Sequence, residues 1–328
     1  MIAKNPRRAR PEIEPERLPP IALVSCAAAR QLDDDLAPLS LALEAAQLPH
    51  RIVDWHDAGI DWSEFSLALL RSTWDYVPRL TEFLGWAERV SALTTLLNPL
   101  PVLRWNTDKH YLADLAQAGI ATVPSRFIEP GGAGAAVLAD WLDGDDAALA
   151  VAHEFVIKPA VGAGSRDAAR YQQADRAAAL EHANRLLQAG RSVLVQPYLG
   201  RVDRDGETAL IYIEGEFSHA IRKGPLLARM SQPTRALFAA ETISARQASA
   251  AERELAERCL ATLARLPALS GCAPLLYARV DLLQDDHGQP RLLELELAEP
   301  SLFFALAKGA AERFATAIRN RARLTTRP

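Results

Sequence analysis

The segment 276–301 most constrains how this chain can fold, because it has the alternating pattern of two strands joined by a short turn. Side chains alternate faces along a strand, so Arg279 and Asp281 share one face of the first strand. With a turn centred on the His-Gly dipeptide, antiparallel register sets Asp281 opposite Glu294. The same register sets Arg279 opposite Glu296. The pattern therefore predicts three carboxylates and one guanidinium on one face of a hairpin.

Three carboxylates on one face of a sheet call for a cation, because like charges placed opposite each other destabilise strand pairing. Oxygen ligands suit Mg²⁺, which takes one or two protein carboxylates and completes its shell with water and nucleotide phosphates. We therefore predict Asp281, Glu294 and Glu296 as metal ligands. Considered alone, the segment leaves open a second interpretation, an acidic hairpin that faces solvent.

The composition describes a globular chain that is large enough for two or three lobes. It has 328 residues, of which 49% are hydrophobic and 24% charged. The net charge of -4 and the pI near 6.0 give no basic field for nucleic acid, and no apolar stretch reaches membrane-spanning length. We expect neither a nucleic-acid nor a membrane partner, and the sequence leaves open whether the chain forms a homo-oligomer.

The cysteines and the first residues bear on the compartment. The 3 cysteines lack the paired spacing of a zinc site and are too few for a disulfide framework, so we expect a reducing cytoplasm. Residues 1–20 combine Arg, Glu and Pro without an apolar core, which predicts a disordered extension and not a signal peptide.

Alternating strands and helices predict an open, parallel α/β domain over residues 21–104. Apolar runs at 21–27, 50–55 and 67–72 read as strands, and Asp33 to Asp35 can cap a helix after the first of them. No GxGxxG motif follows this first strand, so the pattern does not indicate a dinucleotide site.

Polar and aromatic side chains follow the third predicted strand. Ligands of parallel sheets bind beyond the carboxyl ends of the strands, which makes this stretch a candidate substrate site. A loop folded onto its own domain is the alternative. The candidates are Arg71, Trp74, Asp75 and Tyr76.

A smaller α/β lobe is predicted over about 124–199, after a helix that Asn106 or Thr107 can cap and that holds Lys109. In this lobe the strand FVIKPAV ends near Lys158, and a glycine loop follows it. Glycines let backbone N–H groups approach phosphate oxygens, and a nearby ammonium adds positive charge. The loop is predicted to bind an anion, although it lacks the GK[ST] of a Walker motif.

The last third of the chain is predicted to hold two hairpins, a helix over 248–266 between them, and a terminal helix that starts at Pro300. The connector that leads into this region, VQPYL, has apolar and amide groups that could flank an adenine. A buried strand end explains the connector equally well.

Taken together, these features resemble the ATP-grasp enzymes over residues 105–314. The resemblance rests on Lys109, VIKP with its glycine loop, VQPYL, and YARVDL with LLELELAEPS. It implies an α/β fold in which a preATP-grasp domain at 21–104 precedes an ATP-grasp domain at 105–328. The latter would comprise a lid at about 124–199 and a metal and catalytic lobe at about 200–328. RSTWDY, RWNTDK and AEPSLF narrow the resemblance to a bacterial branch with the O-ureido-D-serine cyclo-ligase of cycloserine biosynthesis and glutathione synthetase-like proteins.

The resemblance implies ATP and Mg²⁺ as cofactors and a role for individual residues. Arg279 would stabilise charge on the transferred phosphoryl group, and Lys223 would assist it, although Lys223 and Glu207 read equally well as surface charges. Ser301 joins the substrate candidates named above. The nucleotide contacts would be Lys109, Lys158, Gly162, Gly164, Ser165, Gln196, Pro197, Tyr198, Leu199 and Glu207.

The activity that the resemblance implies is ligation. ATP would phosphorylate the carboxylate of a small amino acid or amino-acid derivative, and an amine would attack the acyl phosphate, giving ADP and phosphate. The alternatives are a phosphotransferase on the same scaffold and a nucleotide-binding module without turnover. Whether ligation closes a ring or joins two molecules stays open. The chain departs from the family by Glu296 where many members have Asn, by a short glycine loop, and by lacking a substrate-binding arginine after the connector.

Overall fold

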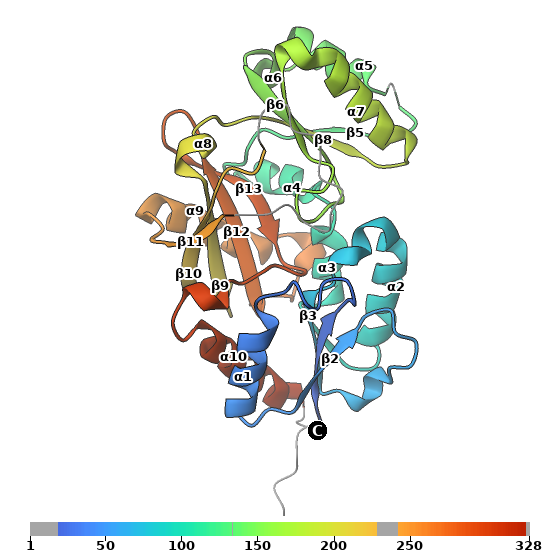
Figure 1. The fold of residues 1–328 in the computed structure, drawn as a ribbon, viewed down its shortest axis with the longest axis vertical. Helices are drawn as coiled ribbons and strands as arrows, with labels where there is room; N and C mark the ends of the chain where they lie inside the picture. The colour runs from blue at the N-terminus through green and yellow to red at the C-terminus, as the bar shows by residue number, and fades with distance from the viewer. Residues whose placement is uncertain (1–18, 133, 228–241, 326–328) are drawn as a thin grey trace, which may run out of the picture.

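The computed structural model describes residues 19–132, 134–227 and 242–325 and distributes them over three sheets (Figure 1). The first sheet is parallel, with strand order β2-β1-β3-β4, and the second is a lid sheet of order β5-β8-β6-β7. The third is antiparallel, with order β11-β10-β9-β12-β13. It lies between the other two in Figure 1. The α/β class expected from the sequence is confirmed.

The parallel sheet forms from apolar runs whose side chains are buried on both faces, as in β1 and β3. The expected extension at 1–20 lies outside the described residues, apart from Pro19 and Pro20. The strands are β1 (Ile21–Ser25), β2 (His50–Asp54), β3 (Leu67–Ser72) and β4 (Thr95–Leu97). The helices are α1 (Leu36–Ala45), α2 (Leu80–Ser91) and α3 (Leu100–Asn106), with 3-10 turns η1 (Trp62–Glu64) and η2 (Trp74–Arg79).

A short helix and the lid follow. Asn106 and Thr107 were expected to cap the helix that follows them, but this is wrong, because both lie at the end of α3. Lys109 therefore lies in the connection between α3 and α4. The lid strands are β5 (Arg126–Ile128), β6 (Glu154–Pro159), β7 (Ala169–Gln172) and β8 (Val193–Pro197). The helices are α4 (Tyr111–Gln117), α5 (Ala136–Asp140), α6 (Ala147–Ala150) and α7 (Arg176–Gln188), with turns η3 (Trp141–Asp145) and η4 (Gln173–Asp175).

The third sheet takes up most of the remaining chain. Its first hairpin turns at Glu214 and Gly215 as expected, and both have positive φ, of 52° and 83°. The strands are β9 (Glu207–Ile213), β10 (Glu216–Lys223), β11 (Ile243–Arg246), β12 (Tyr277–Gln284) and β13 (Pro290–Glu296). The helices are α8 (Val202–Asp205), α9 (Ala250–Leu263) and α10 (Ala310–Thr325), with turns η5 (Pro267–Leu269) and η6 (Phe304–Leu306).

Helix α10 packs beside α1 and joins the first sheet to the third (Figure 1). One buried cluster contains Leu39 and Leu43 of α1, Phe314 and Ile318 of α10, and Ile211 of β9. The two ends of the described chain therefore share one hydrophobic core. Among the described residues, no helix is both long and apolar enough to cross a bilayer.

The expected helix start at Pro300 is wrong. The Asp35 carboxylate accepts hydrogen bonds from the backbone N–H groups of residues 302–304, at 2.5, 3.0 and 2.8 Å. Phe303 has a left-handed backbone with φ of 52°, and α10 begins only at Ala310. Asp35, expected to help cap α1, makes no side-chain cap there and holds this loop instead.

Candidate active site

The acidic hairpin has the register that the sequence predicts at its chemically important end. Asp281 pairs with Glu294 and Arg279 with Glu296. Near the turn the strands pair one residue differently, with Gln284 opposite Pro290, and an irregularity next to Asp281 restores the expected register. Because a slip of one residue moves every side chain to the other face, this bulge keeps the four charged groups together.

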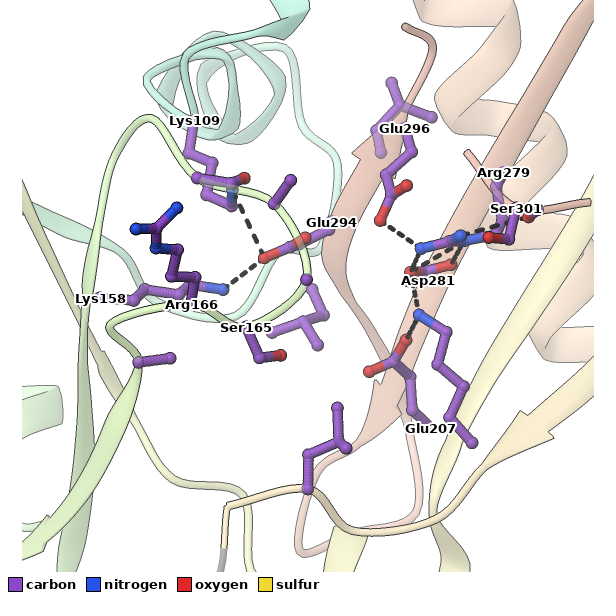
Figure 2. A pocket seen from close by; sticks show the side chains of 18 of the residues that line it. Lys109, Lys158, Ser165, Arg166, Glu207, Arg279, Asp281, Glu294, Glu296 and Ser301 are labelled. Carbon is purple, nitrogen blue, oxygen red and sulfur yellow. Dashed lines mark hydrogen bonds and ion pairs between the residues drawn. The ribbon is translucent and has the colours of Figure 1, made fainter. Parts of the chain in front are cut away.

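The hairpin forms one wall of a cavity of about 530 Å³ that also reaches the lid and the carboxyl end of the parallel sheet. Figure 2 shows part of it, with Lys109 and Lys158 across from the hairpin. Of the residues singled out in the sequence, those that line it are Trp74, Tyr76, Lys109, Lys158, Gly162, Gly164, Ser165, Gln196, Pro197, Tyr198, Leu199, Glu207, Lys223, Arg279, Asp281, Glu294, Glu296 and Ser301.

On the lid side of the cavity, two lysines converge on one carboxylate. Lys158 Nζ lies 2.6 Å from Glu294 Oε1, and Lys109 Nζ lies 3.9 Å from the same oxygen (Figure 2). Lys109 also donates a hydrogen bond to the carbonyl of Gly162 at 2.7 Å, which ties the start of the glycine loop to the wall. Burial raises the pKa of Glu294, but the two ammonium groups outweigh it and lower that pKa to about 2.

On the sheet side, charges alternate in a chain of ion pairs. Arg279 donates to Asp281 from Nε at 2.9 Å and from Nη2 at 2.8 Å, and it also contacts Glu296. Lys223 Nζ lies 2.6 Å from Asp281 Oδ2 and 2.5 Å from Glu207 Oε1. Burial raises the pKa of Asp281, yet Arg279 and Lys223 hold it far below its ordinary value. Burial raises the pKa of Glu207 to about 8 against the opposing effect of Lys223.

The carboxylates can be tested as Mg²⁺ ligands from their remaining acceptor capacity. Both oxygens of Asp281 accept from Arg279 or Lys223, whereas among the described residues Glu294 and Glu296 each use only one oxygen. The described residues contain no ready group of three His, Cys, Asp or Glu side chains for a metal ion. Two carboxylates with free oxygens facing a nucleotide-sized cavity still fit Mg²⁺, which commonly takes only one or two protein ligands.

The VQPYL connector borders an apolar part of the cavity. Gln196 is buried and donates to Ser125 Oγ at 2.9 Å, while Arg170 lies 3.5 Å from the centroid of the Tyr198 ring. The side chain of Gln196 and the ring of Tyr198 are thereby fixed before any ligand enters. The apolar lining of the cavity includes Val123, Val156, Leu199, Leu227, Leu283 and Leu293.

Two of the substrate candidates lie elsewhere than expected. Arg71 is 1% exposed and does not line the cavity, and it donates to the carbonyl of Pro300 at 3.1 Å and to Asp35 at 3.5 Å. Asp75 is also absent from the lining, because its carboxylate accepts from Trp55 Nε1 at 2.7 Å and pairs with an arginine of its own turn. Both side chains therefore bind neighbouring protein groups and stabilise segments next to the cavity.

Three polar side chains that the sequence analysis did not assign to the site hold the backbone of the hairpin. Asn106 bonds the carbonyl of Leu295 and the N–H of Leu297, both at 2.7 Å, and Tyr111 accepts from the N–H of Leu295 at 2.9 Å. Asn98 donates to the carbonyls of Tyr277 and Leu297 at 3.0 and 2.8 Å. The RWNTDK motif was the available signal for Asn106, but it does not identify the partners of that side chain.

Glu299 is a further carboxylate of the cavity that the sequence analysis did not single out. Burial is the main cause that raises the pKa of Glu299 to about 7, and the negative charge of Glu296 raises it further. The hydrogen bond with Tyr76 opposes this shift. From the ordinary value of 4.5 up to about 7, the folded chain keeps a proton that the unfolded chain has released. The contribution of Glu299 to stability therefore falls as pH rises through this window.

We expect Glu299→Gln to gain stability relative to the unmodified chain as pH rises from 5 to 8, because the amide cannot ionise. Urea denaturation at a series of pH values measures this difference. Glu312→Gln, at an exposed position of α10, is the matched control and should leave the profile unchanged. Parallel profiles for Glu299→Gln and the unmodified chain would contradict the assigned pKa shift.

Comparisons with known proteins agree with this geometry. Residues 21–98 match the family model described as "D-cycloserine synthetase DcsG, N-terminal domain". The cycloserine biosynthesis protein DcsG of Streptomyces lavendulae is 40% identical over 301 residues, which are 92% of this chain and 98% of that protein. The crystal structure of D-cycloserine synthetase DcsG superposes with a TM-score of 0.82 at 37% identity, covering 92% of this chain and 99% of that one.

More distant structures share the fold. The D-alanine–D-alanine ligase from Bacillus anthracis complexed with ATP superposes with a TM-score of 0.63 at 15% identity, covering 93% of this chain and 96% of that one. The ATP-grasp ligase PsnB, complexed with minimal precursor, Mg and ADP, has a TM-score of 0.58 at 16% identity over 92% of this chain and 98% of that one. At such identities the likeness establishes the arrangement of the sheets and nothing finer.

Proposed function

Because this chain belongs to the ATP-grasp ligases, in the family of D-cycloserine synthetase DcsG, we propose that it ligates an amino-acid derivative through an acyl phosphate. ATP phosphorylates the substrate carboxylate, and a nitrogen nucleophile attacks the acyl phosphate, so that a C–N bond forms and ADP and phosphate leave. The name of the relative favours ring closure within one molecule, in which the substrate carries both carboxylate and nucleophile.

The observation that carries the proposal is the meeting of two opposite charge patterns in one cavity. Lys109 and Lys158 on the lid side suit the phosphates of a nucleotide, and Gly162 to Ser165 add backbone N–H groups nearby. Facing them, the hairpin offers carboxylates around Arg279. An anion bound by the lid thus lies opposite groups that can hold a metal and stabilise phosphoryl transfer.

Residues of the chain then divide the work by position. Arg279, held by Asp281 and Glu296, points a fixed guanidinium into the cavity where charge on a transferred phosphoryl group would develop. Lys223 helps to keep Asp281 anionic beside it and also contacts Glu207. Glu294 and Glu296, with Asp281 behind them, would hold Mg²⁺, which when bound offsets phosphate charge and orients the phosphoryl group. No protein nucleophile is needed, because positioning and electrostatics supply most of this catalysis.

The remaining walls support a nucleotide and a small substrate. The connector Gln196 to Leu199 and the apolar residues around it suit an adenine ring, with Glu207 near the ribose or phosphates. Trp74, Tyr76 and Ser301 lie on the part of the cavity nearest the parallel sheet and are the proposed substrate contacts.

The lobes are proposed at 21–104 and 105–328, with the lid at about 124–199. The 3 free cysteines suit the cytoplasm.

The products of the nucleotide and a trapping reagent test this function. The chain is incubated with ATP, Mg²⁺, hydroxylamine and a panel of O-substituted D- and L-serines, followed by mass spectrometry. We expect ADP and phosphate together with an acyl hydroxamate of the accepted serine derivative. Release of AMP and pyrophosphate would overturn the acyl-phosphate route, and ADP with a stable phosphorylated serine derivative would identify a phosphotransferase.

A further inference from the structure

The glycine loop of the lid carries an arginine that the function above does not use. Arg166 lines the cavity, and Figure 2 shows it with Lys109 and Lys158 on the lid side, across from Arg279. Within the described part of the chain, its guanidinium makes no hydrogen bond or ion pair. A partly buried cation without a partner is costly, so its position calls for an anion.

The backbone around Arg166 has an uncommon conformation. Ser165 and Asp167, on either side of it, are non-glycine residues with φ of 57° and 60°, in the left-handed region. Such a residue is strained and persists only where its surroundings hold it. Two turns fix the loop, with Arg166 N donating to Ala163 O at 3.2 Å and Ala168 N to Ser165 O at 3.1 Å.

Ion pairs of Asp167 with Arg185 and Arg191, outside the cavity, stabilise this conformation. Its carboxylate lies 2.5 Å from Arg191 Nη1 and 3.5 Å from Arg185 Nη1, and Asp167 does not line the cavity, whereas Arg166 does. The loop therefore separates two adjacent charges, with the carboxylate turned to the helix α7 side and the guanidinium turned to the ligand side.

The charge balance of the two walls indicates which ligand Arg166 meets. Lys109, Lys158 and Arg166 face a single carboxylate, Glu294, so the lid wall has two positive charges in excess. On the opposite wall, Arg279 and Lys223 are already paired with Asp281, Glu296 and Glu207, so that wall has no comparable excess of positive charge. Only the lid wall therefore suits a ligand with several negative charges. The phosphates of a nucleotide carry such charge, whereas a substrate with one carboxylate does not.

We propose that Arg166 is a third cation for the β- and γ-phosphates of ATP and that Asp167 is the positioning residue that aims it. The inference rests on the proposed function, because it takes ATP as the bound nucleotide. Arg166 adds what the lysines do not, since its planar fork of donors can hold two phosphate oxygens in a fixed geometry.

Titration calorimetry with AMPPNP and AMP tests the role of Arg166. We expect Arg166→Ala to weaken AMPPNP binding by at least about 10-fold and to leave AMP binding within about 2-fold, because only the outer phosphates are lost as partners. Arg166→Lys should recover part of the loss as a point charge. Arg176→Ala, which breaks an exposed lid ion pair with Asp143, is the matched control and should change neither affinity.

The positioning role of Asp167 is tested by asking whether the effect of its substitution on AMPPNP binding depends on Arg166. Asp167→Asn should weaken AMPPNP binding in the unmodified chain but have little further effect in Arg166→Ala, a coupling that general loosening of the lid would not produce. Unchanged AMPPNP affinity in Arg166→Ala, or an equal loss for AMP, would overturn the inference. If the unmodified chain failed to bind AMPPNP, the proposed function itself would fall.

Discussion

Glu294→Gln is expected to lower ATP-dependent turnover by more than about 100-fold while the chain remains folded, because losing a direct metal ligand costs more than losing a group that only orients a ligand, which costs about 10–100-fold. The pKa of Glu294, lowered to about 2, keeps this side chain anionic at any working pH, so the amide removes a full charge. Turnover should be followed as ADP release over a range of Mg²⁺ concentrations, and excess Mg²⁺ should restore part of it.

A second acid of the same hairpin provides the control for Glu294→Gln. Asp285 accepts from the N–H groups of His287 and Gln289 and pairs with Arg291, so Asp285→Asn should destabilise the turn without changing the Mg²⁺ requirement. Thermal denaturation of both variants separates folding from activity. A Glu294→Gln chain with normal turnover would remove this residue from the metal site.

Arg279→Lys is expected to reduce kcat by about 100–1000-fold, the range seen when a donor that stabilises transition-state charge is lost. A lysine keeps the positive charge but cannot donate at once to Asp281, to Glu296 and to the carbonyl of Ser301, as the guanidinium does. The KM for ATP should change little, because Lys109 and Lys158 lie on the opposite wall.

Steady-state kinetics with the substrate identified by trapping would measure this separation of kcat from KM. Lys109→Met serves as the opposite case, in which the KM for ATP should rise more than kcat falls. An Arg279→Lys chain with unchanged kcat would show that the guanidinium acts in structure alone. Some loss of stability is expected in either case, since Asp281 is buried and would keep only Lys223 as a strong partner.

Local pattern was sufficient to predict the hairpin but not its irregularity. The alternation of Arg279 with Asp281 and of Glu294 with Glu296, together with one turn dipeptide, determined which side chains meet. The bulge beside Asp281 had no sequence signal. The strands pair one residue differently near the turn, and the bulge cancels this difference, so the pairing at Asp281 is the same as in a hairpin without either irregularity. The parallel sheet was predictable for a similar reason, since its strands are short apolar runs separated by a helix or a loop.

Contacts between distant segments could not be predicted in the same way. Asp35 and Leu302 lie 267 positions apart, and no local rule favours this loop over the N-terminus of α1 as the partner of the carboxylate. Arg71 was expected to face a ligand because it ends a parallel strand, yet burial made the carbonyl of Pro300 the better partner. The meeting of Lys158 with Glu294 was implied by family resemblance, not by either segment.

The packing of α10 against α1 sets a constraint on the order of events during synthesis. Leu39 and Leu43 leave the ribosome long before Phe314 and Ile318, which cover them. Domains ordinarily fold as they emerge, beginning with the N-terminal one. Here the first sheet keeps an uncovered apolar face until α10 has been made, so a chain that stops before α10 exposes a surface suited to chaperone capture or aggregation.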